Sequence, residues 1–280
     1  MRPAPTMPDQ AHFFRSPALP ETELLTARYR THSFAPHWHE GYVVAVVLDG
    51  AEGYRYRGAQ HVAGAGGIAC INPGEVHTGE RAAEEGWAYR VFYPSASVIA
   101  DLASQLRGGK AQAISTGLPR LPQNVVEDRP VANALVRAHL LLEAGQDALE
   151  AQTATLNALS ALLTRHAQAP NAAPSLRGES ARVEAMRQRL SVELTEPLTL
   201  DQLAASVGLS PFHAARLFAQ ATGMPPHAWR NQQRLNRSLD LLRAGQSVAE
   251  AAVACGFTDQ SHYTRHFRRA YGTSPGRWRG

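Results

Sequence analysis

The last part of the chain gathers side chains that suit contact with a polyanion. Between Gly256 and Gly280 the sequence has five arginines, two histidines, two tyrosines, two phenylalanines and a tryptophan, but a single acid, Asp259. Arginine presents a planar fork of donors that matches both a phosphate and the edge of a guanine. This composition fits both a solvated basic tail and a folded nucleic-acid-binding surface. The spacing of the residues distinguishes these two interpretations.

The distribution of charge supports two separate roles for the two halves of the chain. From Arg177 onward there are 14 arginines and 8 acidic residues, whereas residues 1–176 hold 14 basic and 16 acidic residues. A chain of 280 residues is long enough for two domains with their own cores. No apolar run reaches the roughly 18–20 residues that cross a membrane, and the N-terminus lacks the apolar core of a secretion signal. With only Cys70 and Cys255, far apart, we expect a cytoplasmic protein without membrane contact.

The basic half contains an internal repeat. The stretch "LDQLAASVGLSPFHAARLFAQATGMPP" (200–226) aligns with "VAEAAVACGFTDQSHYTRHFRRAYGTSP" (248–275), with one extra residue in the second copy. The matching pairs include Gly208 with Gly256, Arg216 with Arg265, Phe218 with Phe267, and Gly223 with Gly272. Agreement over so many spaced positions indicates a duplicated structural unit.

Each copy has the signals of a helix, a tight turn and a second helix. Thr199 with Gln202, and Ser247 with Glu250, are capping-box starts. A glycine then supplies the turn, where positive φ is cheap for glycine alone, and a further glycine ends the second helix. This pattern predicts a helix-turn-helix, in which the second helix can enter a major groove of DNA.

A single long helix is predicted between the two copies. "PPHAWRNQQRLNRSLDLLRAG" gives an amphipathic helix of about 18 residues, roughly 27 Å long. Its expected inward residues are Ala228, Trp229, Leu235, Leu239 and Leu242. A rod of this length can hold two recognition helices about one DNA turn, some 34 Å, apart.

Residues 181–280 therefore resemble the two-headed DNA-binding domain of the AraC/XylS family of bacterial transcription regulators. The resemblance implies that residues early in each second helix contact bases. The matching positions are Phe212, His213, Ala215 and Arg216 in the first copy, and Asp259, Gln260, Ser261, His262 and Arg265 in the second.

The chemistry of these residue types agrees with base contact. Arginine can bond bidentately to guanine and glutamine to adenine, and Phe212 can meet a thymine methyl group. Ala215 lacks a polar group and weakens direct readout by the first helix. Further residues are expected to contact phosphates, which adds affinity without sequence preference; these are Ser210, Arg230, Arg234, Arg268, Arg269 and Arg277. Each arginine could instead belong to a solvated helix face.

The front half has the pattern of a small β-barrel. Residues 22–94 alternate short β-branched and aromatic segments with glycine and proline turns. Five strands are expected, in "LLTARYRTHSF", "YVVAVVLDG", "GYRYRG", "GIACI" and "WAYRVFYP". The stretches "PHWHEGYVVAVVLDG" (36–50) and "GAGGIACINPGEVHTGE" (64–80) resemble the two cupin motif segments, in the form that AraC-type regulators use as a ligand-binding jelly roll. The expected fold is α+β, a cupin-like jelly roll followed by an all-α domain of two helix-turn-helix units.

The cupin resemblance also implies a ligand set for a metal. Cupin enzymes use H-x-H, a nearby carboxylate and a later histidine, which here places His37, His39 and His77 together but puts Val43 at the carboxylate position. We therefore predict no metal and no cofactor, with the histidines lining an effector pocket instead. Trp87 and Tyr89 share one face of a strand and are expected to line that pocket or to belong to the core. Phe13 and Phe14, in a loose N-terminal arm, could fold over its mouth.

A helical region, 129–166, follows the barrel. Leu149, Leu156 and Leu163 recur every seven residues, and Leu159 lies between the last two, so we predict a homodimer seam along 148–166 rather than packing against the barrel alone. The Pro/Ala/Asn/Ser-rich stretch 167–180 reads as a linker. The predicted division is thus 1–166 for effector binding and dimerisation, 167–180 for the linker, and 181–280 for DNA binding.

These features predict a transcription regulator that is not an enzyme. Its expected partners are a double-stranded DNA operator, a small-molecule effector, a second copy of the chain and RNA polymerase. Two alternatives stay open: a cupin metalloenzyme fused to a DNA-binding domain, and a regulator with a vestigial pocket controlled by a protein partner. Effector binding would shift the dimer between arrangements of its DNA-binding domains.

Overall fold

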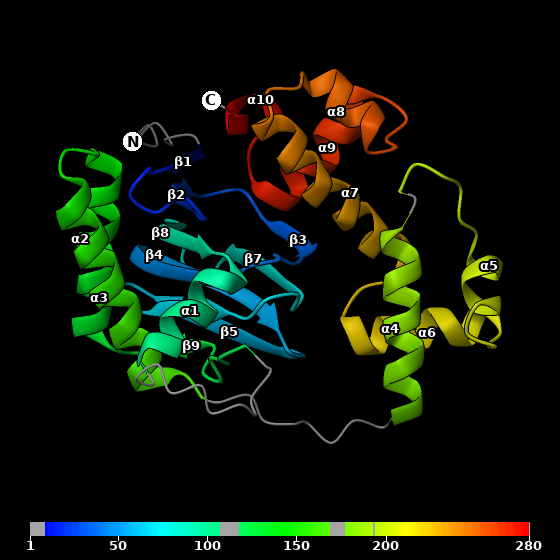
Figure 1. Ribbon diagram of the computed structural model, residues 1–280, viewed down its shortest axis with the longest axis horizontal. Helices are drawn as coiled ribbons and strands as arrows, with labels where there is room; N and C mark the ends of the chain where they lie inside the picture. Colours follow the sequence, from blue (N-terminus) through cyan, green and yellow to red (C-terminus); the bar gives the residue numbers. More distant parts are fainter. Residues whose placement is uncertain (1–8, 107–117, 169–176, 193, 280) are drawn as a thin grey trace, which may run out of the picture. The chain divides into compact units, whose positions relative to one another are not determined.

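The computed structural model describes residues 9–106, 118–168, 177–192 and 194–279 (Figure 1). The chain forms two compact units. One holds most of a β-sheet and the first three helices, and the other holds the remaining helices together with residues 34–38 and 76–78. No helix in these ranges is both long and apolar enough to cross a membrane. The predicted linker lies largely outside the described residues, and its last residues, from Arg177, are helical.

The β-sheet has nine strands within the described residues. They are β1 (Gln10–Arg15), β2 (Thr22–Tyr29), β3 (Phe34–His37), β4 (Val43–Tyr56), β5 (Ala59–Gly64), β6 (Ile68–Ile71), β7 (His77–Arg81), β8 (Trp87–Pro94) and β9 (Val125–Val126). The main path runs β1-β2-β8-β4-β6-β9, with β5 and β7 beside β4, and β3 beside β7. The pairings β1–β2, β2–β8, β4–β8 and β4–β6 are all antiparallel. This sheet confirms the β-rich class expected for the front half.

Alternation along the central strands gives the sheet two apolar faces. Leu24 on β2, Val44 and Val46 on β4, and Phe92 on β8 pack in one core with the helices that follow the barrel. Their neighbours in sequence, such as Leu25 and Val91, point to the opposite face and are equally buried. Strands buried on both faces explain the unbroken apolar run "YVVAVVL".

Two of the predicted strands are one. "YVVAVVLDG" and "GYRYRG" join in β4, a strand of 14 residues, because its register against β8 shifts between Val47 and Asp49 and the strand continues past the irregularity. A tight turn then leads into β5. Its residues Arg57 and Gly58 have φ of 51° and 78°, as a two-residue hairpin turn requires.

Helices α1 (Ala96–Leu106), α2 (Arg129–Ala144) and α3 (Ala148–His166) accompany the sheet. The predicted helical region 129–166 is thus two helices, because Gly145 takes a left-handed conformation with φ 62° and ends α2. Polar contacts also join α2 to the sheet. The Arg90 guanidinium on β8 donates to Glu143 at 2.5 Å and lies 2.9 Å from Nδ1 of the buried His139.

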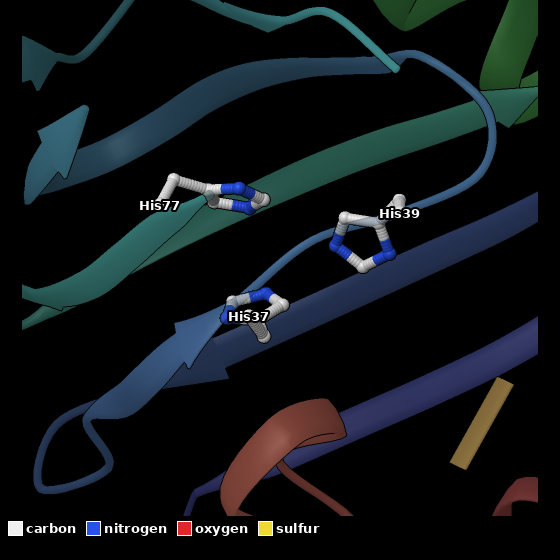
Figure 2. A group of neighbouring side chains, drawn as sticks. All are labelled: His37, His39 and His77. Carbon is white, nitrogen blue, oxygen red and sulfur yellow. The ribbon is translucent and has the colours of Figure 1, made fainter. Parts of the chain in front are cut away.

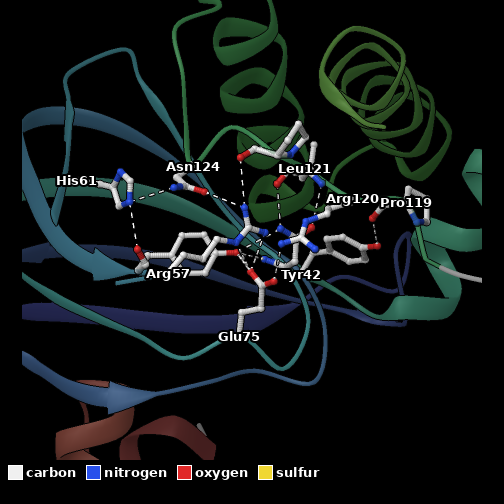
Figure 3. Close-up of polar contacts among 11 residues, drawn as sticks. Tyr42, Arg57, His61, Glu75, Pro119, Arg120, Leu121 and Asn124 are labelled. Atoms are coloured by element: carbon white, nitrogen blue, oxygen red, sulfur yellow. Dashed lines mark hydrogen bonds and ion pairs between the residues drawn. The ribbon is translucent and has the colours of Figure 1, made fainter. Parts of the chain in front are cut away.

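A second polar cluster fastens residues 119–124 to the barrel (Figure 3). Asn72 accepts the Leu121 backbone N–H at 2.9 Å and donates to the Leu121 carbonyl at 2.9 Å. Glu75 forms ion pairs with Arg57 at 2.8 Å and Arg120 at 3.2 Å. Asn72 and Glu75 both come from "NPGEVH". This motif therefore bonds residues 120–121 to the barrel and also supplies His77.

The other unit contains seven helices within the described residues. They are α4 (Arg177–Ser191), α5 (Leu200–Ala205), α6 (Pro211–Thr222), α7 (Pro226–Arg243), α8 (Val248–Ala254), α9 (Gln260–Tyr271) and α10 (Pro275–Arg279). Both predicted capping boxes are present, on α5 and α8. Helix α7 has 18 residues, as the sequence predicts.

Helix α7 takes part in both repeats. Near its start, Trp229 packs edge-on against Phe218 of α6, with ring centroids 5.8 Å apart. Further along, Ser238 accepts a hydrogen bond from the Tyr263 hydroxyl at 2.9 Å, and Asn236 accepts one from Tyr271 at 3.0 Å, both from α9. One helix therefore supports α6 and α9 through buried contacts.

Candidate DNA-binding surface and effector site

Helices α6 and α9 are equivalent position by position. Each has 12 residues and ends at a left-handed glycine, Gly223 or Gly272. The eighth residue is a phenylalanine in both, Phe218 or Phe267, and each is fully buried. The sixth residue in both is an arginine on the exposed side. The repeat seen in the sequence is thus a repeat of structure.

The predicted base-contacting residues lie in the first two turns of these helices. Phe212 is 71% exposed, which is unusual for a phenylalanine and leaves its ring open to a partner. The other members of the set are exposed or half-buried; these are His213, Ala215, Arg216, Gln260, Ser261, His262 and Arg265. Two histidines also bond locally, since Nδ1 of His213 lies 3.3 Å from the Ser210 hydroxyl and Nδ1 of His262 lies 3.0 Å from the Thr258 hydroxyl.

Five of the arginines predicted to contact DNA are exposed; these are Arg216, Arg265, Arg268, Arg269 and Arg277. Among the described residues none of their guanidinium groups forms an ion pair or hydrogen bond. Exposed cations that no acidic residue neutralises create a positive surface and keep their donors available for an anion. Burial, and then the charges of His262, Arg269 and Arg265, lower the pKa of the half-buried His266 on α9.

Asp259 has a structural role that the sequence analysis did not assign. It is the N-cap of α9, where its carboxylate accepts the His262 backbone N–H at 2.7 Å. This hydrogen bond holds the pKa of Asp259 below its usual range. The cap commits one carboxylate oxygen to the helix end, and the predicted base contact of the exposed Asp259 stays a prediction. Ser210 caps α6 in the same way, and its predicted phosphate contact stays a prediction.

Two arginines predicted to contact phosphates are used inside the unit. Arg230 is 8% exposed and donates to the Glu196 carbonyl. Arg234 is half-buried, and its Nε donates to the Leu194 carbonyl at 2.9 Å. Both satisfy backbone carbonyls in the loop after α4, where the chain has no regular partner. The assignment of the buried Arg230 to phosphate is therefore corrected, whereas the internal bond of the half-buried Arg234 disfavours its predicted phosphate contact without contradicting it.

The three predicted histidines do come together (Figure 2). His37 ends β3, His77 begins β7 and His39 precedes β4, and one nitrogen from each lies within 4.8 Å of the others. The rings of His37 and His77 are 4.3 Å apart between centroids, and Nδ1 of His37 lies 2.8 Å from the Ala35 carbonyl. Their convergence confirms the spatial grouping that the motif spacing predicts.

The histidine group has part of what a metal site needs. Ligand nitrogens around Zn²⁺ lie about 3.3 Å apart, since Zn–N distances are about 2.0–2.1 Å, so 4.8 Å would require the rings to move inward. Within the described ranges no cysteine or carboxylate joins the group. Val43, at the position where cupins place an acid, is buried and apolar.

Trp87 and Tyr89 lie on one face of β8, as predicted, and both are buried. Tyr29 of β2 joins them, since its ring centroid is 5.2 Å from Trp87 and 6.1 Å from Tyr89. The predicted loose arm with Phe13 and Phe14 is instead strand β1, paired with β2 along its whole length. Phe14 packs edge-on against His139, so it belongs to the helix-facing side.

Glu52 is a residue that the sequence analysis missed. It lies on β4, is 8% exposed, and its charge acts on Tyr29, Tyr54 and Tyr89. Burial raises the pKa of Glu52 to about 8. The only signal in the sequence was an acid in phase with Tyr54 and Tyr56 on an otherwise apolar and aromatic face.

The predicted leucine seam on α3 is only partly exposed. Leu149 is 75% exposed and Leu156 is 45% exposed, whereas Leu159 and Leu163 are buried in the core of their own unit. A seven-residue spacing keeps Leu149 and Leu156 on one face, but Leu159 and Leu163 face α1, α2 and the sheet. The four-residue seam is thus corrected to the two exposed leucines.

The fold and surface define a two-domain regulator, with a ligand-binding β-domain and a double helix-turn-helix. A family model described as an AraC-like ligand binding domain matches residues 19–159, and a model described as a helix-turn-helix domain matches residues 203–280. The chain belongs to the AraC family of transcription regulators.

Individual relatives agree with this assignment. RhaS of Klebsiella pneumoniae, an HTH-type transcriptional activator, is 24% identical over 91% of this chain and 90% of its own length. YbfI of Bacillus subtilis is 25% identical over 82% of this chain and 81% of its own. The structure of ToxT from Vibrio cholerae matches with a TM-score of 0.57 over 97% of this chain and 96% of its own, at 9% identity, and so shows a shared fold.

Proposed function

We propose that this regulator binds its operator through the exposed first turns of α6 and α9. The observation that carries this proposal is the pair of equivalent arginines, Arg216 and Arg265, both exposed and without a partner group among the described residues. In this role Gln260 and Phe212 add adenine and thymine-methyl contacts, and Arg268, Arg269 and Arg277 neutralise phosphates. The protein acts on DNA in the cytoplasm, has no catalytic activity of its own, and affects transcription directly or through RNA polymerase.

Selection of DNA fragments by the purified full chain tests this proposal. Sequencing of the bound fragments should give a motif with two conserved blocks about 10 base pairs apart, because two recognition helices on one face of DNA are separated by one turn. A double variant, Arg216→Ala with Arg265→Ala, should lose the motif. Enrichment that is equal for the wild-type chain and this variant would refute the assignment.

The effector is proposed to bind in the interior of the barrel, where Trp87 and Tyr89 lie. One solved structure of ToxT is of the protein bound to an unsaturated fatty acid. A ligand with a carboxylate is disfavoured here if it lies near the buried carboxyl of Glu52. A rise in melting temperature with a metabolite, together with a change in operator affinity and no turnover, would support sensing. Oxygen-dependent consumption of that metabolite would support an enzyme instead.

The exposed face of α3 is proposed as the contact between two copies of the chain. Leu149 and Leu156 are large apolar side chains on the exposed side of a helix whose opposite side is buried by its own unit. Leu156→Glu should weaken the dimer, because the seam would have to bury an unpaired charge. Sedimentation of the full chain should show a shift toward monomer.

A neighbouring substitution serves as the control for the dimer. Asn157 is exposed and lies about 100° further around the helix, so Asn157→Glu adds the same charge away from the leucines. This variant should sediment as the wild-type chain does. A wild-type chain that is monomeric at micromolar concentration, or equal effects of the two variants, would rule out this seam.

Metal binding is the second candidate function for the histidine group. His37, His39 and His77 converge, but the group lacks a protein carboxylate in the described chain. We expect the purified protein to hold well under one equivalent of transition metal. Elemental analysis that found one tightly held ion per chain, lost in His77→Ala but retained in His61→Ala, would favour the metal-binding alternative.

A further inference from the structure

Glu52 is a buried acid whose presence the fold does not explain. It is 8% exposed and lies on β4 in phase with Tyr54, so both side chains leave the same face of the strand. Among the described residues Glu52 has no hydrogen bond and no ion pair. Burying a carboxyl without a partner costs free energy, whichever protonation state it adopts. Such a group in a ligand-binding domain is a candidate for contact with the ligand.

Tyrosines on three strands feel the charge of this carboxyl. Its charge acts on Tyr29 of β2, Tyr54 of β4 and Tyr89 of β8, so all three lie near it. Trp87 completes the group, with its ring centroid 5.2 Å from Tyr29 and 6.1 Å from Tyr89. The faces of tyrosine and tryptophan rings carry negative electrostatic potential and attract cations.

No positive group in the described part of the chain balances Glu52. Burial alone accounts for its raised pKa, and no arginine, lysine or histidine contributes. Burial also raises the pKa values of Tyr29, Tyr54 and Tyr89, which therefore stay neutral. Asp9 and His32 act on one another, and Asp9 also acts on Tyr29, but neither contributes at Glu52. Among the residues that the structure describes, Glu52 therefore has no cationic partner.

We propose that the effector site takes a small organic cation, whose charged nitrogen pairs with Glu52 and packs against Tyr29, Trp87 and Tyr89. This inference rests on the proposed effector function of the barrel and names the chemical class of its ligand. The cation supplies the counter-charge that the protein lacks, and the rings exclude water around it. A neutral or anionic ligand of the same shape leaves the carboxyl unpaired and binds more weakly.

The protonation state of Glu52 makes this pairing depend on pH. With a pKa of about 8, the free protein carries the neutral acid at pH 6, and only the ionised form pairs with a cation. If binding requires that form, affinity for a permanent cation should rise roughly 50-fold between pH 6 and pH 8 and then level off. Binding at pH 7 should release close to one proton, about 0.9, per cation.

Two matched pairs of probes test the ligand class by calorimetry on the full chain. Choline is compared with its neutral isostere, in which a tert-butyl group replaces the trimethylammonium group. Ethanolamine is compared with propanol in the same way. At pH 8 at least one cation should bind about tenfold more tightly than its isostere, since a buried contact to a charged group adds this much. Equal binding within both pairs, or no binding by either cation, would overturn the proposal.

Glu52→Gln isolates the charge while keeping the shape of the side chain. This variant should lose the preference for the cation, the pH dependence and the proton release, whereas Glu84→Gln, at an exposed acid, should keep all three. The variant should fold, because the native state already favours the uncharged acid. Its melting temperature at pH 8 should equal or exceed that of the wild type. A Glu52→Gln chain that binds the cation with unchanged affinity would show that the carboxyl is not the partner.

The outcome is separable from that of the regulatory function. Operator binding is measured on the same preparations without any ligand. Suppose that the chain binds the operator and that an uncharged metabolite changes its affinity for the operator. In that case the proposed regulatory function is supported, and only the assignment of a cationic effector fails. If the operator is not bound at all, the DNA-binding proposal fails, whatever the calorimetry with choline and ethanolamine gives.

Discussion

The two helix-turn-helix units share a skeleton and differ in the surface that they present. Both second helices have 12 residues, a polar N-cap, a buried phenylalanine at the eighth position and an arginine at the sixth. At the second position α6 has the exposed Phe212, whereas α9 has Ser261. In the second half α6 has Ala219 and Gln220, where α9 has two exposed arginines. Burial and capping constrain the N-cap and the buried eighth position. The exposed second, ninth and tenth positions carry no such constraint, so they can differ according to their contacts with DNA.

This difference predicts that the two helices contribute differently to DNA binding. Helix α9, with Arg265, Arg268 and Arg269, should supply most of the electrostatic attraction, which is sensitive to salt. Helix α6 offers a single arginine together with an apolar ring, which can distinguish a thymine methyl but contributes no charge. The second unit should therefore dominate affinity, and the first should add sequence preference.

The largest effects are expected from the shared skeleton. Phe218→Ala and Phe267→Ala should each lower the free energy of unfolding of the helical unit by about 3–5 kcal/mol, because each removes a fully buried ring. Denaturant titration followed by circular dichroism measures this loss. Phe212→Ala, at a 71% exposed ring, should change stability by less than about 0.5 kcal/mol. A large loss in only one of the two core variants would show that the skeletons are not equivalent.

The next effects concern the arginines at the sixth position. Arg265→Ala and Arg216→Ala should each cost about 1–3 kcal/mol on the operator and relax the preference for one base pair. The two relaxed positions should lie about 10 base pairs apart. Binding to operator and to random DNA gives both quantities. Equal loss on the two DNAs for Arg265→Ala would identify it as a phosphate contact.

Removal of the helix caps should have a smaller effect that depends on pH in only one unit. Thr199→Ala and Ser247→Ala should each cost about 1 kcal/mol of stability. Hydrogen bonds from Ser247 hold the pKa of Glu250 below its usual value, whereas the partner in the other box is Gln202, which does not titrate. The contribution of Glu250 is therefore present above its unfolded pKa and lost as the pH falls through the lowered folded value. The cost of Ser247→Ala should shrink in acid, and that of Thr199→Ala should not.

The smallest expected effect is a change in salt dependence. Arg268→Ala should weaken all DNA sequences alike and make the slope of log affinity against log salt shallower by about one unit. Arg234→Ala should leave the slope unchanged and lower stability instead, because its Nε is bonded to the Leu194 carbonyl. A shallower slope for Arg234→Ala would restore it as a phosphate contact.

The sequence predicted what depends on local signals and missed what depends on packing across the fold. The capping boxes, the turn glycines and the repeat predicted the positions of helices α5 to α9 along the sequence closely. Nothing local distinguishes Arg230 and Arg234, which bond loop carbonyls, from the arginines that remain exposed, since the distinction requires the position of the loop after α4. The exposure of Leu149 and Leu156 likewise depends on which side of α3 the rest of its unit covers.

The β-domain shows the same limit. Motif spacing brought His37, His39 and His77 together correctly, because the resemblance to the two cupin motif segments implies that these three positions converge. Strands β1, β3, β5, β7 and β9 were missed, since they are short or carry polar residues and are defined by their partners rather than by their own alternation. Glu52 was missed for the same reason, as its environment comes from Tyr29 and Tyr89 on two other strands.

Helix α7 sets the rotational phase between the two halves of the helical unit. Trp229 belongs to the packing around α6, while Ser238 and Asn236 are hydrogen-bonded to α9, and an α-helix between them resists twisting. DNA turns by about 34–36° per base pair, so one inserted base pair between the two contact blocks would rotate the second block by that angle. Helices α6 and α9 could follow such a rotation only if the buried hydrogen bonds between α7 and α9 were broken. Operators should therefore tolerate base changes between the blocks far better than insertions or deletions.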